Sequence, residues 1–126
     1  MVHSYRKGYA KELSLVHTLA GLGYMAVRMP RSGRINLPSP DIIALKDGRT
    51  IVIECKAREE AFKIEAAQLQ ELKQWQDAGA KALIAWKLSR KEWVFLHLKD
   101  VLDNEGRIGK NFASAKGFKL ADISLV

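Results

Sequence analysis

The chain has 126 residues, enough for one compact domain and too few for two. Apolar residues make up 48% of it, and no apolar run approaches the length of a membrane span. A single cysteine, Cys55, excludes an internal disulfide, and the formal net charge of +7 favours an anionic partner such as nucleic acid. Because the N-terminus also lacks the pattern of a signal peptide, we expect a cytoplasmic protein with no membrane contact.

The first predicted elements are a helix over residues 9–22 and a strand over residues 24–29. The helix is indicated by apolar residues at helical spacing followed by glycines, and the strand ends at Pro30. Residues 31–40 contain serine, glycine, asparagine and proline and are predicted to form a loop. The residues expected on the inward stripe of the helix are Leu13, Val16, Leu19 and Ala20.

A β-hairpin is predicted next, with strands over residues 41–45 and 50–56. The Asp47-Gly48 pair between them favours a tight turn with positive φ angles. The second strand is apolar along most of its length, which is typical of a central strand. The hairpin therefore brings the start of its first strand beside the end of its second.

A second helix is predicted over residues 65–78, followed by strands over residues 81–86 and 92–98. A helix between two strands indicates a crossover and a parallel pair, whereas the hairpin is antiparallel. The predicted fold is thus a single α/β domain, residues 1–126, with a mixed sheet of about five strands flanked by helices. After Leu98 the pattern weakens, and only a turn over residues 104–107 is predicted.

Three residues of the hairpin carry candidate chemistry: Asp41, Glu54 and Lys56. Side chains alternate along a strand, so Glu54 and Lys56 point to one face, and Asp41 on the neighbouring strand can reach it. Each feature alone has a structural explanation, because Glu-x-Lys can be a solvated ion pair and Pro-Asp commonly starts a turn. Their combination at the end of an apolar strand favours a catalytic site.

This combination suits metal-assisted hydrolysis of a phosphodiester. The carboxylates of Asp41 and Glu54 are ligands that Mg²⁺ prefers, with the Cys55 carbonyl oxygen as a further candidate and Mn²⁺ as a possible substitute ion. Lys56 could orient or deprotonate the attacking water, or neutralise the developing negative charge. Basic residues on both sides of the site are candidates for contacts with the phosphates of DNA. They are Arg6, Lys7, Arg31 and Arg34.

The motif Pro40-Asp41 followed by Glu54-Cys55-Lys56 resembles that of the PD-(D/E)xK nucleases, whose core is restriction-endonuclease-like. Further residues make the chain similar to one branch, the archaeal Holliday junction resolvases. These are the opening Tyr5-Arg6-Lys7-Gly8 with Glu12, and Ala26-Val27-Arg28 with Ser32 and Gly33. The resemblance covers residues 5–98.

The resemblance implies a magnesium-dependent endonuclease that acts as a homodimer and makes paired nicks across a four-way DNA junction. It also implies that Glu12 is an additional acidic residue and metal ligand, although without the resemblance a surface glutamate is the more common explanation. Arg28 and Ser32 would contact the scissile strand or shape the site.

Two other functions stay open at this point. One is a general or restriction-type endonuclease that cuts linear duplex, and the other is a non-catalytic DNA-binding module. The dimer interface is also open. Large apolar residues near the last predicted strand and the tail are candidates for it, but they could instead complete the core of the monomer. They are Trp93, Phe95, Phe112 and Phe118.

Overall fold

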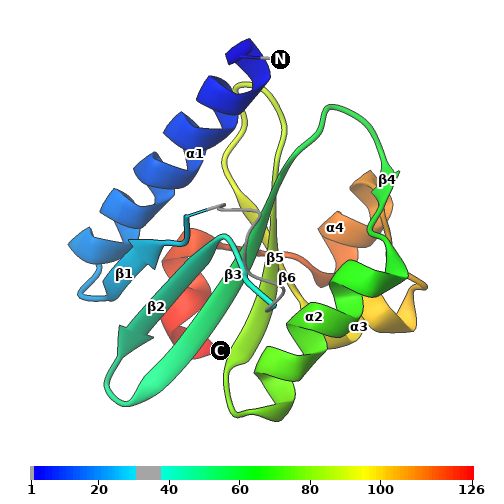
Figure 1. Ribbon diagram of the computed structural model, residues 1–126. Helices are drawn as coiled ribbons and strands as arrows, with labels where there is room; N and C mark the ends of the chain where they lie inside the picture. The colour runs from blue at the N-terminus through cyan, green and yellow to red at the C-terminus, as the bar shows by residue number, and fades with distance from the viewer. Residues whose placement is uncertain (1, 31–37) are drawn as a thin grey trace.

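The computed structural model describes residues 2–30 and 38–126, with side chains from residue 8 onward. Figure 1 shows a twisted central sheet with helices on both sides. Within these residues the main sheet has six strands, in the order β1-β2-β3-β5-β6-β8. They are β1 (Met25–Arg28), β2 (Ile42–Lys46), β3 (Arg49–Ala57), β5 (Lys81–Lys87), β6 (Val94–His97) and β8 (Phe118–Lys119). Two short strands, β4 (Phe62–Lys63) and β7 (Arg107–Ile108), form a separate antiparallel pair.

The mixed character of the sheet is confirmed. Strands β3 and β5 pair in parallel, whereas the other neighbours in the described sheet are antiparallel. The parallel pair follows from the crossover through α2 (Ala66–Asp77), because a helix between two strands returns the chain to the same edge. The prediction of about five strands missed β8, which has two residues and is too short to show a period.

The β2–β3 hairpin has the turn that its sequence predicts. Asp47 and Gly48 have φ angles of 52° and 77°, as a type I′ turn requires at both central positions. The turn sets a register in which Ile42 pairs with Ile53. Asp41, one residue before β2, is therefore brought beside the segment of β3 that contains Glu54.

Helices cover both faces of the sheet, and each face has its own apolar core (Figure 1). On one face α1 (Val2–Gly21) packs Leu15 and Leu19 against Ile42 and Ile53, together with Ile123 of the 3-10 helix η1 (Leu120–Leu125). On the other face α2, α3 (Leu98–Asp103) and α4 (Lys110–Lys116) cover the alternate residues of the strands. The residues of this second core include Val52, Leu69, Leu72, Ile84 and Val101.

The start and the face of the first helix differ from the prediction. Helix α1 begins at Val2 rather than at residue 9, so Arg6 and Lys7 lie within it and do not precede it. Its buried residues are Glu12, Leu15 and Leu19, whereas Leu13 and Val16 are half-buried and Ala20 is exposed. The predicted stripe correctly included Leu19 but missed Leu15 and Glu12, since a buried glutamate does not contribute to an apolar pattern.

The chain after β6 is also more regular than predicted. Leu98, expected in a strand, begins α3, and β7, α4, β8 and η1 follow it. The helices α3 and α4 have six and seven residues, less than the two turns over which helical periodicity becomes visible. None of the helices in the described part of the chain is both long and apolar enough to span a lipid bilayer.

The aromatic residues considered for a dimer interface pack within the monomer instead. Phe95 is fully buried, and the ring of Phe118 stacks on it with centroids 5.8 Å apart. Trp93 and Phe112 are half-buried and pack against the two cores. Three of the exposed large apolar side chains lie together at the edge formed by β1 and β2, where Met25, Val27 and Leu45 are 78%, 57% and 47% exposed. The others in the described residues are Tyr9, Leu22 and Leu125.

Candidate active site

Asp41 is held at the junction of three strands. Its backbone N–H donates to the Ile53 carbonyl (3.0 Å), and its own carbonyl accepts from the Met29 N–H (2.8 Å). The carboxylate oxygen Oδ2 accepts a hydrogen bond from the Cys55 backbone N–H at 2.7 Å. Cys55 lies between Glu54 and Lys56, so this bond holds the Asp41 carboxylate against the part of β3 that carries the other two candidate residues. Asp41 is 5% exposed.

Glu54 and Lys56 are joined through the side chain of a third residue, Gln68 of α2. The Gln68 amide Nε2 donates to Glu54 Oε2 at 2.5 Å, and its Oε1 accepts from Lys56 Nζ at 2.9 Å. Lys56 Nζ also lies 3.8 Å from Glu54 Oε2. Gln68 thus holds a buried carboxylate and an ammonium group side by side on the face of the sheet that α2 covers.

Gln68 was missed by the sequence reasoning, although the sequence contains a signal for it. It precedes Leu72 by four residues and Trp75 by seven, so all three lie on one face of the helix. Leu72 is buried and Trp75 packs against the same core. A glutamine at an inward position needs partners for its amide, and Glu54 and Lys56 are those partners.

Glu12 and Arg28 form a second polar pair, between α1 and β1. Arg28 Nε donates to Glu12 Oε1 at 3.0 Å, and the guanidinium carbon lies 4.3 Å from the centre of the Tyr9 ring. Glu12 is 7% exposed, so it is not the surface glutamate that the sequence alone also allowed. The structure brings Glu12 and Arg28 together, but among the described residues no three Asp, Glu, His or Cys side chains form a metal-binding cluster.

Five of the predicted site residues have side chains outside the described part of the chain. Ser32, Arg31 and Arg34 lie in the segment 31–37, outside the described residues. Arg6 and Lys7 lie on α1, but their side chains are also outside the described part. Cys55 is half-buried, and its side chain packs against the core beneath α1. Its backbone faces Asp41, which is where the sequence places a candidate ligand.

The donor atoms around Asp41 and Glu54 fit a hard divalent cation. Asp41 and Glu54 are both buried residues, and burying negative charge is costly unless a cation or hydrogen-bond donors compensate for it. Peptide N–H and C=O groups of one residue face the same side of an antiparallel strand, so the Cys55 carbonyl is directed towards Asp41, as its N–H is. Two carboxylates and one carbonyl leave further coordination positions of an ion such as Mg²⁺ to water.

A mixed sheet covered by helices on both faces, with Asp41, Glu54 and Lys56 where β2 and β3 meet, is the architecture of an α/β protein with a restriction-endonuclease-like core. The sequence matches the family of archaeal Holliday junction resolvases (Hjc) over residues 3–125. The chain therefore belongs to this family, as the motifs of its sequence predict.

The names of individual proteins similar to this chain agree with this family assignment. The crossover junction endodeoxyribonuclease Hjc of Archaeoglobus fulgidus is 38% identical over 92 residues, which span 71% of this chain and 67% of that protein. The crossover junction endodeoxyribonuclease Hje of Sulfolobus acidocaldarius is 31% identical over 104 residues, 78% of this chain and 74% of that protein. A solved structure of A. fulgidus Hjc, a Holliday junction resolvase, superposes with a TM-score of 0.80 at 28% identity, covering 91% of this chain and 96% of that one.

Proposed function

We propose that this chain is a magnesium-dependent DNA endonuclease that resolves four-way junctions by paired nicks. The observation that carries the proposal is the arrangement of Asp41, Glu54 and Lys56 on two paired strands, with Gln68 joining the last two. Membership of the Holliday junction resolvase family supports the junction as substrate, since the relatives are named for that activity. The net charge of +7 suits a polyanionic substrate.

In this proposal Mg²⁺ is held by the carboxylates of Asp41 and Glu54 and by the Cys55 carbonyl. Mg²⁺ commonly binds proteins through one or two carboxylates and keeps several waters, so no larger acidic cluster is needed. Mn²⁺ is a possible substitute. Glu12 remains a candidate further ligand, and in the structure its carboxylate accepts a hydrogen bond from Arg28. A bound ion of this kind lowers the pKa of its water and stabilises negative charge on the phosphate.

Lys56 supplies positive charge beside the reacting phosphate. Its ammonium group has three N–H donors, and Gln68 Oε1 accepts one of them. A second donor can reach a phosphoryl oxygen or the attacking water, where it stabilises the charge that develops in the transition state. The bond to Gln68 and the neighbouring Glu54 keep the ammonium group at this position before substrate binds.

A homodimer is the proposed working unit, because resolving a junction needs two nicks and the chain has one Asp41, Glu54 and Lys56 set. The exposed face of β1 and β2 is the surface that best suits self-association. Met25 and Leu45 are paired in register on this face, and Val27 lies two residues along β1. A contiguous exposed apolar patch of this kind commonly marks an interface.

The substrate is tested by cleavage in Mg²⁺ of a synthetic four-way junction and of linear duplexes that contain its arm sequences. We expect paired nicks in junction strands of like polarity and much slower cleavage of the duplexes. Equal rates on both substrates would indicate a general endonuclease instead. Binding without cleavage, in Mg²⁺ and in Mn²⁺, would indicate that the protein is a non-catalytic DNA-binding module.

Replacing Gln68 by leucine should lower kcat for junction cleavage by about 10–100-fold, the effect typical of residues that orient a metal ligand. The substitution removes both hydrogen bonds that hold Glu54 and Lys56 in place. KM should change little, because Gln68 positions other groups rather than binding DNA. The measurement is the initial rate of junction cleavage under multiple turnover, over a range of junction concentrations.

The matched control for this variant is Gln74→Leu, the same substitution at an exposed position of α2. It should leave both kcat and KM unchanged. If Gln68→Leu folds and cuts as fast as the wild type, Gln68 does not position the site.

A further inference from the structure

A polar pocket of about 450 Å³ lies beside the candidate active site, where β3 ends and α2 begins. Lys56 and Gln68 belong both to the site and to this pocket. The pocket continues along the chain to Arg58, just after β3, and to Lys63 in β4. Its other lining residues are Phe62, Ile64, Glu65, Ala67 and Glu71.

The two additional cations of this pocket have unused hydrogen-bonding capacity. Arg58 has five N–H donors, and its one side-chain hydrogen bond to a described residue is to the Ala57 carbonyl at 3.3 Å. Its guanidinium lies 6.0 Å from the centre of the Phe62 ring, which stabilises the cation without using a donor. Lys63 makes no ion pair with any described residue.

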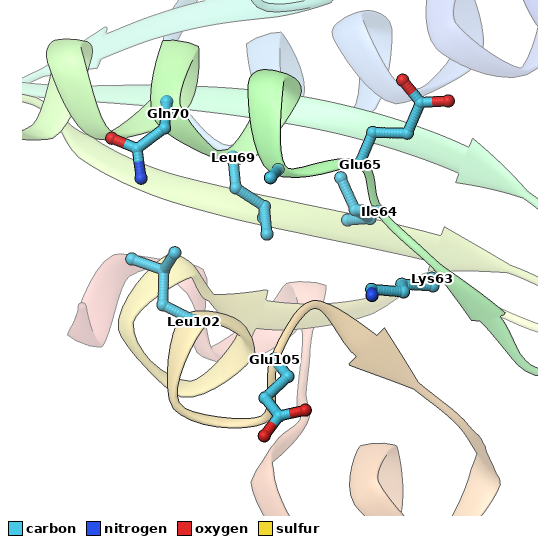
Figure 2. Close-up of a pocket in the computed structure, with 8 residues that line it drawn as sticks. Lys63, Ile64, Glu65, Leu69, Gln70, Leu102 and Glu105 are labelled. Carbon is cyan, nitrogen blue, oxygen red and sulfur yellow. The ribbon is translucent and has the colours of Figure 1, made fainter.

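The acidic residues of the pocket do not neutralise these cations. Neither Glu65 nor Glu71 lies within ion-pair distance of Arg58 or Lys63. Lys63 also borders a neighbouring pocket between α2 and α3. Figure 2 shows that the Glu65 carboxylate is directed away from the Lys63 side chain. The side chain of Lys63 is long and flexible, so its ammonium group can serve either pocket.

A second positive charge lies next to Lys63 and makes the binding of an anion there more favourable. Strand β4 pairs with β7 so that Lys63 lies directly opposite Arg107. Both side chains are exposed, and directly opposed like charges destabilise a strand pair. A bound anion would relieve this repulsion.

The spacing of the cations matches a nucleic acid backbone. Lys56 lies in β3, and Arg58 lies just beyond its end, where its backbone N–H still donates to the Lys87 carbonyl. Two residues of strand span about 6.7 Å, and both side chains line the same pocket. Successive phosphates of one DNA strand are separated by a similar step. A strand whose scissile phosphate lies at Lys56 can therefore place its next phosphate at Arg58 without bending sharply.

We propose that the pocket of Arg58 and Lys63 is a second phosphate subsite, which binds the phosphate next to the scissile one on the cleaved strand. The inference rests on the proposed function, because the register of the strand is set by cleavage at Lys56. Arg58 supplies a planar group that can donate two hydrogen bonds to one phosphate, and Lys63 supplies a mobile second charge.

The test is a scan with methylphosphonate, which replaces one charged phosphate of the cleaved strand at a time by a neutral group. Binding is measured in an Asp41→Asn background, so that the DNA stays intact, with and without Arg58→Ala/Lys63→Ala. When Arg58 and Lys63 are intact, a neutral group at the position next to the scissile phosphate should weaken DNA binding about tenfold or more. The same replacement should have little further effect on the double variant.

A matched control is Arg49→Ala/Lys81→Ala, which removes the same charge from exposed positions at the opposite end of β3 and β5. It should keep the full sensitivity to the neutral phosphate.

The slope of log affinity against log salt should fall by about one in the Arg58/Lys63 variant if a single phosphate contact is lost. The subsite would be overturned if, at every scanned position, the neutral group lowers DNA affinity equally in the presence and absence of Arg58 and Lys63.

Cleavage separates this inference from the proposed function. With Asp41 restored, the Arg58/Lys63 variant should raise KM with little change in kcat, because the subsite holds substrate and transition state equally. The scan uses whichever DNA the wild-type protein cuts, so a preference for linear duplex would refute junction resolution and leave the subsite intact. A wild-type protein that cleaves no DNA would refute the proposed function and the subsite's register together.

Discussion

Asp41→Asn and Glu54→Gln should each abolish nicking of a four-way junction while leaving the protein folded and able to bind DNA. Each substitution removes a negative oxygen ligand of the proposed Mg²⁺, and the loss should exceed the roughly 10–100-fold typical of residues that only orient a ligand. The fold should survive because the amide oxygen of asparagine can still accept the Cys55 N–H. A glutamine at position 54 can likewise accept the Gln68 amide.

The measurement is the single-turnover cleavage rate in Mg²⁺, with junction affinity determined separately in Ca²⁺. Calcium should support binding with little cleavage, because its looser coordination positions water poorly. Asp47→Asn is the matched control, since it makes the same change in the hairpin turn, where asparagine suits the positive φ angle. Nicking by Asp41→Asn at the wild-type rate would rule out the proposed site.

A mixed dimer of one wild-type and one Asp41→Asn subunit should convert a plasmid with an extruded junction into a nicked circle and yield little linear product. Each subunit has one candidate site, and two cuts require two active subunits. The mixed dimer can be purified by a size tag on one subunit, and the products separated by electrophoresis. The tagged wild-type dimer, as control, should linearise the plasmid.

The proposed interface can be tested in the same assay. Val27→Glu places a charge in the exposed face of β1 and β2, so it should shift the protein towards monomer and reduce linear product in the same way.

If the mixed dimer linearises the plasmid as well as the wild type does, one site cuts both strands. The requirement for two active subunits would then be wrong.

The sequence by itself determined the parts of the site that depend on local geometry. The Asp47-Gly48 turn sets the register of β2 against β3, and the alternation of side chains along β3 puts Glu54 and Lys56 on one face. These relations span few residues and need no knowledge of the rest of the fold. The family motif is readable for the same reason, because its three residues lie on one hairpin.

Only the tertiary structure decided the contacts between distant segments. Gln68 reaches Glu54 and Lys56 because the crossover lays α2 over β3, and Arg28 meets Glu12 because α1 packs across β1. Polar residues buried by such packing leave no periodic apolar signal, and the strands and helices after β6 are too short to have one. The free cations of the pocket beside Lys56 were likewise hidden in the sequence. Exposure and pairing are set by the neighbours that folding supplies, and these lie far away along the chain.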